Sequence, residues 1–157
     1  MELIIDRVSK QFKNKIVADQ ISLKLTPGVY GLLGANGAGK TTLMRMICGI
    51  LKPDRGTITL DGRDAEEEAY REALGYLPQD FGYYPEFTGM DFLMYLASLK
   101  GIPKREAKKR CKEMTELTGL TGMEKKKIKI YSGGMIRRLG IAQALLNHPK
   151  ILILDEP

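Results

Sequence analysis

The sequence is poor in the residues that build disulfide-rich or metal-rich folds. It has only two cysteines, Cys48 and Cys111, in 157 residues. Both lie in helical patterns, and neither has the spacing of metal ligands. We therefore expect both thiols to be buried as small apolar groups, in a protein of the reducing cytoplasm.

Long apolar runs are also missing. Stretches such as Ile151–Leu154 are far too short to span a bilayer. The N-terminus lacks a basic start followed by a hydrophobic core, so no signal peptide is indicated. No internal repeat or low-complexity linker interrupts the chain. Any link to a membrane is therefore expected to come through a partner.

Positive charge is concentrated in one part of the chain. The net charge is +6, but residues 100–129 alone hold 11 basic and 4 acidic residues, an excess of 7. Such a stretch could contact anionic lipid headgroups, nucleic acid or an acidic partner. A solvated helix face is the simpler interpretation, because basic side chains readily sit in water.

The length is that of one domain, and the hydrophobic content of 43% fits a globular core. The most informative motif is Gly34–Thr41, GANGAGKT, with glycines at its first and sixth positions followed by Lys-Thr. The apolar run Val29–Leu33 predicts a buried strand entering this loop, and Thr41–Ile47 predicts a helix leaving it. That context favours a phosphate-binding loop for ATP or GTP over a flexible glycine turn.

The elements expected before the middle of the chain are mostly short strands. Alternation and turn residues predict strands at Glu2–Val8, Gln20–Leu25, Thr57–Leu60 and Gly75–Pro78, and a helix at Asp64–Leu74. Asp61-Gly62 has the character of a hairpin turn.

The period changes to that of helices after residue 86. Thr88 and Asp91 are suited to start one helix, and Pro103 to open a second at its first position. We expect residues 86–130 to be a helical subdomain inserted in a single α/β domain. A further helix begins at Ser132 and ends near His148-Pro149, where His148 is expected to be a turn residue.

The last residues place two carboxylates after the apolar stretch Ile151–Leu154, expected to be a buried strand. Open α/β sheets bind ligands at the carboxyl ends of their strands. Asp155 is therefore a candidate for a Mg²⁺ site, and Glu156 for polarising a water that attacks the γ-phosphate. Ser132-Gly133-Gly134, at a helix N-terminus, is a second phosphate-friendly element.

Together these motifs resemble the ATP-binding domain of ATP-binding cassette (ABC) proteins. The motifs are Gly34–Thr41, Gln79 after Tyr76-Leu77-Pro78, Ser132-Gly133-Gly134 and the terminal ILILDEP, in the order that family uses. The resemblance covers the whole chain. It implies a P-loop NTPase core of the α/β class, an N-terminal antiparallel β-subdomain and the inserted α-helical subdomain, C-terminally incomplete.

The resemblance also implies roles for individual residues. Lys40, Thr41 and Thr42 would bind phosphates and Mg²⁺, with Lys40 also catalytic. The backbone of the loop, Gly34, Asn36, Gly37, Ala38 and Gly39, would bind ATP. Gln79 would sense the metal and the attacking water while touching a transmembrane partner, Asp155 would hold the metal from its second shell, and Glu156 would be catalytic.

Two further sites follow from the same resemblance. Phe12 falls where the family stacks an aromatic ring on adenine, although packing in the core is an alternative for it. Ser132, Gly133 and Gly134 would contact the γ-phosphate held by a second copy, in a two-fold homodimer or heterodimer.

The resemblance breaks off at Pro157. In the family, later residues supply another core strand and a switch histidine, and His148 precedes the Asp-Glu pair and cannot be that histidine. We therefore expect an N-terminal part of a longer ATPase, weak or inactive alone. Its sheet would have exposed edges between the strand entering the phosphate loop and the strand ending at Asp155.

The expected function is the ATP-binding subunit of an ABC transporter, hydrolysing MgATP to drive export through a separate membrane permease from the inner face of the cell membrane. The order of motifs, including Phe81–Pro85, resembles bacterial multidrug or peptide-antibiotic exporters. A soluble ABC ATPase acting on ribosomes or nucleic acid is the alternative. The 92 positions between Lys40 and Ser132 leave no room for the coiled coil of repair-type members, and no nucleic acid is expected. A defective fragment without activity is a third possibility.

Overall fold

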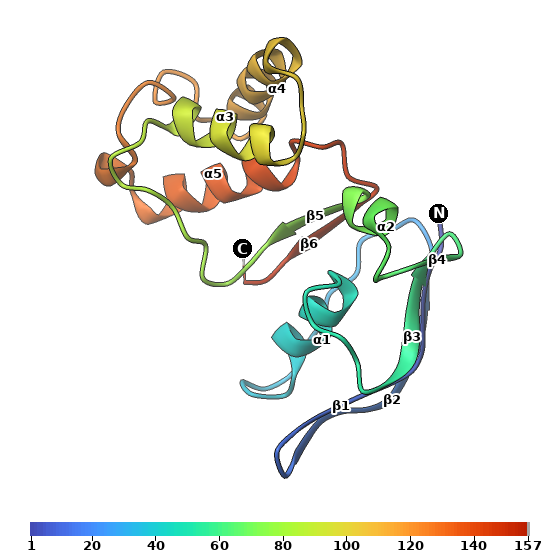
Figure 1. Ribbon diagram of the computed structural model, residues 1–157. Helices are drawn as coiled ribbons and strands as arrows, with labels where there is room; N and C mark the ends of the chain where they lie inside the picture. Colours follow the sequence, from blue (N-terminus) through green and yellow to red (C-terminus); the bar gives the residue numbers. More distant parts are fainter. Residues whose placement is uncertain (157) are drawn as a thin grey trace. The chain divides into compact units, whose positions relative to one another are not determined.

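A computed structural model describes residues 1–156, which form two compact units, Met1–Glu72 and Ala73 onward (Figure 1). The first holds an antiparallel sheet and the helix that follows the phosphate loop. The second holds a parallel strand pair and a group of helices.

The sheet of the first unit has the strand order β2-β1-β3-β4. Its strands are β1 (Leu3–Phe12), β2 (Lys15–Leu25), β3 (Arg55–Leu60) and the short β4 (Arg63–Asp64). Every adjacent pair is antiparallel, with Leu3 opposite Leu60 and Ile5 opposite Ile58. This register puts alternate apolar residues on one face, where they are buried. The three strands predicted here are confirmed, with longer bounds.

Two helices complete the first unit. Helix α1 (Lys40–Ile47) confirms the predicted helix after the phosphate loop and buries Leu43, Met46 and Ile47. Helix α2 (Glu68–Glu72) is much shorter than the predicted span Asp64–Leu74. The prediction was too long because Asp64 pairs with Thr59 in the sheet and Leu74 begins the next strand.

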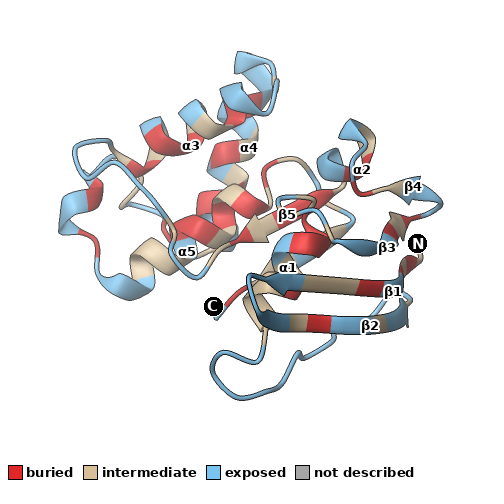
Figure 2. Ribbon diagram, turned by 60° about the horizontal axis from the view of Figure 1, so that its bottom comes forward, coloured by how far each residue is buried: buried red, intermediate tan, exposed pale blue. Residues whose placement is uncertain are grey.

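The prediction of a buried strand at Val29–Leu33 is wrong in this structure. No strand is formed there, and Val29 and Leu33 are 103% and 92% exposed. The whole segment 26–38 is exposed (Figure 2). A strand needs a neighbour for its backbone N–H and C=O groups, and no strand among residues 1–156 pairs with this segment.

The second unit is built on two parallel strands, β5 (Leu74–Leu77) and β6 (Ile151–Leu154). Both strands were predicted. The expected burial of β6 is wrong in part, because Leu152 is exposed and its neighbours are only half-buried. Within the described residues β6 is paired with β5 alone, so no strand pairs with its other edge.

Three helices follow: α3 (Gly89–Leu99), α4 (Lys104–Leu117) and α5 (Gly133–Ala144), with a 3-10 turn at Ile128–Ile130. Helix α5 packs on β5, and α3 and α4 pack on α5 and on each other. Each alternates buried and exposed residues along its length (Figure 2). Their buried residues form one core that includes Phe92, Leu93, Cys111, Leu139 and Leu146. Apolar residues at helical spacing therefore build this core, as predicted.

The predicted helix starts are confirmed in detail. The Thr88 hydroxyl accepts a hydrogen bond from the Asp91 backbone N–H at 3.1 Å, and the Ser132 hydroxyl accepts one from the Met135 N–H at 3.3 Å. Pro103 is the N-cap of α4 and not its first helical residue, a difference of one position. Both cysteines are buried, as expected.

Candidate functional site

The phosphate loop in the first unit has the backbone conformation of an anion-binding turn. Gly37 and Gly39 have φ angles of 78° and 90°, which residues with a Cβ atom rarely adopt. A Cβ atom on Gly39 would also lie 2.6 Å from the Val17 carbonyl oxygen. Position 39 therefore requires glycine for two reasons, its backbone conformation and its closeness to Val17.

The start of α1 is open to a negative charge. No side chain caps the helix, and its first turn has no acidic residue. The Lys40 ammonium donates to the Gly34 and Ala35 carbonyl oxygens at 2.7 and 3.0 Å, across the loop. The first N–H groups of a helix have no intrahelical acceptor, so a lysine, free N–H groups and the helix dipole all favour a bound phosphate.

Other predicted residues of the first unit are accessible to varying degrees. Asn36 and Ala38 are exposed in the loop, while Thr41 and Thr42 are half-buried in the first turn of α1. Phe12, at the end of β1, is 46% exposed, which contradicts the alternative that it packs in the core. The Lys10 ammonium lies 5.6 Å from the centre of the Phe12 ring. Its contact with adenine stays a prediction.

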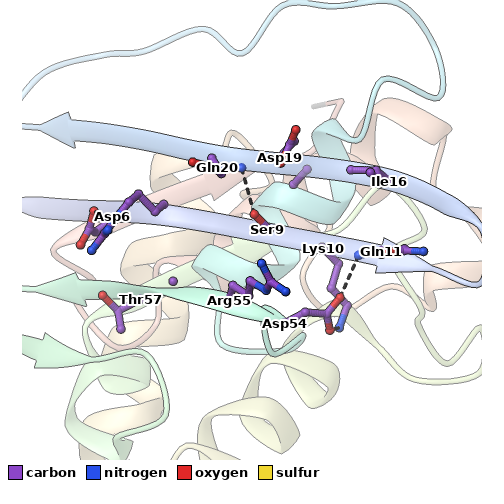
Figure 3. Close-up of a pocket in the computed structure, with 13 residues that line it drawn as sticks. Asp6, Ser9, Lys10, Gln11, Ile16, Asp19, Gln20, Asp54, Arg55 and Thr57 are labelled. Carbon is purple, nitrogen blue, oxygen red and sulfur yellow. Dashed lines mark hydrogen bonds and ion pairs between the residues drawn. The ribbon is translucent and has the colours of Figure 1, made fainter.

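A hollow of 710 Å³ lies over the sheet of the first unit (Figure 3). It forms where β1 bulges, because the pairing register shifts between Ile5 and Val8 and Arg7 has a φ of 47°. Its lining carries both charge signs, including Asp6, Lys10, Asp54 and Arg55. None of the predicted ATP-binding residues lines it, so we do not assign the nucleotide to this hollow.

Asp155, in the second unit, is a buried carboxylate directly after β6. Its backbone N–H donates to the Leu77 carbonyl oxygen at 3.0 Å, which continues the pairing of β5 with β6. Its side-chain oxygen Oδ2 is buried and has no hydrogen-bond partner among the described residues. A buried carboxylate oxygen needs a partner, and a hard cation such as Mg²⁺ fits this atom.

A metal ion at Asp155 would need further ligands that are not His, Cys, Asp or Glu side chains. Within residues 1–156 no group of three or more His, Cys, Asp or Glu side chains is placed to hold a metal ion. Mg²⁺ commonly takes one or two carboxylates and completes its coordination with water and substrate phosphates. The surroundings of Asp155 therefore suit a metal that arrives with a nucleotide.

Gln79 and Glu156 are in direct contact in the second unit. The Gln79 amide nitrogen Nε2 donates to Glu156 Oε2 at 2.9 Å, although 77 positions separate them. Both side chains are exposed. The parallel pairing of β5 and β6 explains the contact, because the two residues follow the carboxyl ends of neighbouring strands. A water beside Glu156 would meet both a proton acceptor and a hydrogen-bonding amide.

Sequence reasoning missed a third residue at this point. Arg137, on α5, donates from Nη1 to the Gln79 backbone carbonyl oxygen at 3.0 Å. Arg137 as a whole residue is half-buried. Nothing local in the sequence indicated this contact, because 58 positions separate the two residues.

The Ser132–Gly134 segment lies at the N-terminus of α5, and all three residues are exposed. A Cβ atom on Gly133 or Gly134 would meet nothing within 4 Å. The residues of this segment therefore leave room for a ligand or a second molecule at the helix N-terminus.

Aromatic side chains in contact with one another extend from the helical core of the second unit to its surface. Phe92 is buried and packs edge-on against Phe81 and Tyr84, with ring centres 5.8 and 6.2 Å apart. Tyr84 in turn contacts Phe87 and Tyr95 at 5.1 and 6.0 Å. Tyr84, Phe87 and Tyr95 are exposed and make up what we call the aromatic surface. Exposed aromatic clusters of this kind are typical of protein interfaces.

The basic stretch 100–129 is partly neutralised within the molecule. Lys109 and Lys112 pair with glutamates one turn along α4, and Lys127 and Lys129 both bind Glu86 at 2.9 and 3.1 Å. These contacts favour the interpretation of a solvated, ion-paired face. No helix among residues 1–156 has the length and apolar character needed to cross a membrane.

The comparisons with known proteins agree with the motifs and the fold. The family model "ABC transporter" matches residues 18–157. The uncharacterized ABC transporter ATP-binding protein YdbJ of Bacillus subtilis is 44% identical over 158 residues, covering 99% of this chain and 50% of YdbJ. The linearmycin resistance ATP-binding protein LnrL of the same organism is 40% identical over 155 residues, covering 97% and 50% of the two chains.

Solved structures give the same result. The structure of cbiO1 from Clostridium perfringens, described as part of the ABC transporter complex cbiONQ, matches with a TM-score of 0.85 and 29% identity over 99% of this chain and 65% of cbiO1. The chain belongs to the ABC transporter family, and its fold is that of the family's ATP-binding domain. It spans about half the length of the curated relatives it matches.

Proposed function

We propose that this chain is part of an ATP-binding subunit that, as the complete protein, binds MgATP and hydrolyses it at the interface of a two-fold dimer, to drive export through a separate membrane subunit. The observation that carries the proposal is the glycine loop before α1, with Lys40 across its carbonyl groups and no acid in the first turn of the helix. Membership of the ABC transporter family supports the same conclusion.

In this proposal the residues of the first unit bind the nucleotide. The Lys40 ammonium leaves the Gly34 and Ala35 carbonyl groups and contacts the β- and γ-phosphates, while the loop N–H groups of Gly37 to Gly39 surround the phosphate chain. Thr41 and Thr42 offer hydroxyl groups to the phosphates and to Mg²⁺. Phe12 stacks on the adenine ring.

Residues of the second unit act on the terminal phosphate. Within this unit Gln79 and Asp155 would hold Mg²⁺, which when bound would neutralise charge on the phosphate oxygens. The Glu156 carboxylate polarises the attacking water and accepts its proton. The Gln79 amide orients that water and the carboxylate, since it already binds Glu156.

The exposed Ser132–Gly134 segment is proposed to contact the γ-phosphate held by a second copy. A helix N-terminus with a hydroxyl and two glycines suits a phosphate that approaches from another molecule. Each nucleotide would then lie between the phosphate loop of one subunit and α5 of the other, as a two-fold axis requires. Homodimer and heterodimer both satisfy this arrangement.

The aromatic surface is proposed to dock a cytoplasmic segment of the membrane subunit. Its first residue, Tyr84, follows Gln79 by five positions, so docking there would be coupled to the catalytic amide. This arrangement makes the protein a peripheral one on the inner face of the cell membrane. An export role is supported by LnrL, which is named for resistance to linearmycin.

Two variants of the protein encoded by the full reading frame test the proposal. Lys40→Ala is expected to abolish ATP binding, measured by equilibrium titration with a fluorescent ATP analogue. Glu156→Gln is expected to retain binding and to lose at least about 100-fold in turnover, because the proton acceptor is gone. Unchanged ATP affinity in Lys40→Ala would contradict the proposed site, and unchanged turnover in Glu156→Gln the proposed role of that carboxylate.

A further inference from the structure

Two side chains of α5 and one from the turn after it, Asn147, donate hydrogen bonds to backbone carbonyl groups along and just beyond β5. Asn147 donates to the Leu74 carbonyl oxygen at 3.1 Å, and Gln143 donates to that of Tyr76 at 2.8 Å. Arg137 donates to that of Gln79 at 3.0 Å, beyond the end of the strand. The segment from Arg137 to Asn147 therefore runs antiparallel to β5. One hydrogen bond lies at each end of this segment, and the third, from Gln143, lies between them.

Glycines let the helix approach this closely. A Cβ atom on Gly75 would collide with the Ala144 carbonyl oxygen, and one on Gly140 would collide with a methyl group of Leu77. The opposite edge of β5 is paired with β6. The carbonyl groups at Leu74 and Tyr76 point away from β6, since carbonyl direction alternates along a strand. Gln143 and Asn147 thus give these two carbonyl groups hydrogen-bond donors on the side away from β6.

Arg137 differs from Gln143 and Asn147 in the residue that accepts its hydrogen bond. Its acceptor belongs to Gln79, whose side-chain amide binds Glu156 at 2.9 Å. Gln79 is therefore fixed at two points, by Arg137 at its backbone and by Glu156 at its side chain. Arg137 is also five positions after Ser132, the N-cap of α5, so one helix joins the exposed Ser132–Gly134 segment to the contact with Gln79.

We propose that Arg137 is a positioning residue that carries movements of the Ser132 end of α5 to the Gln79–Glu156 pair. The inference rests on the proposed function. When a second copy's γ-phosphate binds at Ser132–Gly134, α5 shifts and Arg137 draws the Gln79 backbone with it. Occupancy of one nucleotide site then adjusts the hydrolytic residues of the other. Small misplacements of such groups lower the rate of a chemical step strongly.

The test replaces Arg137 in the protein encoded by the full reading frame. Arg137→Met keeps the length and apolar contacts of the stem but removes the donor, and Arg137→Lys keeps a donor for the carbonyl. The matched control is Arg110→Met. Arg110 donates to the Leu145 and Leu146 carbonyl oxygens at the opposite end of α5, at 2.9 and 3.3 Å. Each variant is made with and without Gln79→Ala.

Arg137→Met is expected to lower kcat for ATP about tenfold while the Kd and KM for ATP change less than about twofold, and Arg137→Lys to restore most of the rate. In the Gln79→Ala background, Arg137→Met should have no further effect on kcat, because it acts through Gln79. Arg110→Met is expected to lower the Tm, and its effect on kcat should be small and the same in both backgrounds.

The inference is overturned if Arg137→Met leaves kcat unchanged, raises Kd as much as it lowers kcat, or reduces kcat equally in both backgrounds. If Arg137→Met does not fold, Arg137→Lys and Arg137→Gln replace it in the same double-mutant cycle with Gln79→Ala. Effects on kcat that are equal with and without Gln79→Ala would then contradict the inference. A wild-type protein that neither binds nor hydrolyses ATP would instead contradict the proposed function.

Discussion

The side-chain amide of Gln79 and the carboxylate of Glu156 are joined by a hydrogen bond of 2.9 Å. The two residues follow neighbouring parallel strands, so the pairing of Leu77 with Leu154 brings them together. Under the proposed function, the amide would hold the Glu156 carboxylate in place to accept a proton from water.

The first prediction replaces this donor by a second carboxylate. In Gln79→Glu two carboxylates face each other, so one of them takes a raised pKa and the attacking water is less well oriented. ATP turnover of Gln79→Glu should be lower than that of Gln79→Ala at pH 8. The difference should narrow as the pH falls and the pair takes up a proton. A pH profile of kcat for both variants checks this, and parallel profiles would contradict it.

A second prediction compares two glycines of the phosphate loop. Both have positive φ, but a Cβ atom would meet the Val17 carbonyl at Gly39 and open space at Gly37. Gly37→Ala should cost about 1–2 kcal/mol of free energy of unfolding from its backbone conformation alone. Gly39→Ala should cost more and weaken ATP binding more. Equal losses of Tm and ATP affinity in the two variants would show that the Val17 contact has no role.

Much of the fold could be predicted from local patterns, and the exceptions have a common cause. Thr88 and Ser132 were identified as helix starts because their caps need only nearby residues. Val29–Leu33 was predicted as a strand from its apolar run. A strand also needs a partner strand for its backbone hydrogen bonds, and that partner can lie anywhere in the sequence. The length of α2 was overestimated for the same reason, because Asp64 and Leu74 are taken up by strand pairing.

The candidate site also has one part that the local sequence predicts and another part that it does not. The phosphate loop was predictable because eight consecutive residues contain its geometry. The Arg137–Gln79 contact was not, because it depends on how closely α5 packs on β5, which Gly75 and Gly140 allow. Contacts of this kind depend on tertiary packing, and no periodicity along the chain reports them.

The third prediction concerns the buried carboxylate of Asp155. Its Oδ2 atom has no hydrogen-bond partner within residues 1–156, so the charge is costly until a cation binds. Asp155→Asn should leave the Tm without ligand unchanged or raised. It should abolish the extra stabilisation that Mg²⁺ adds to ATP. Thermal unfolding with ATP, with and without Mg²⁺, measures this, and full Mg²⁺-dependent stabilisation in the variant would exclude Asp155 from the metal site.

A fourth prediction follows from Glu86, which binds Lys127 and Lys129. Hydrogen bonds from Lys127 and then Lys129 lower the pKa of the Glu86 carboxyl. The stabilisation is therefore present above the unfolded pKa of about 4.3 and is lost as the pH falls through the lower folded pKa. Glu86→Gln should lower the Tm slightly at pH 7, less so in 1 M salt, and not at all in strong acid. Glu106→Gln, on the exposed start of α4, is the control, and an equal shift in both variants would rule out the ion pairs as the cause.

The last prediction addresses the exposed segment Val29–Leu33. Its apolar side chains are uncovered and its backbone is unpaired among the described residues, a combination that favours association between chains. The double variant Val29→Lys, Leu33→Lys should raise the monomer fraction of the 157-residue chain, measured by light scattering after size exclusion. Leu99→Lys with Leu117→Lys is the matched control, since these leucines are 68% and 67% exposed but lie in helices whose backbone groups are largely paired. An equal gain from both double variants would mean that apolar exposure alone drives association, and no gain from the first would exclude this segment as its cause.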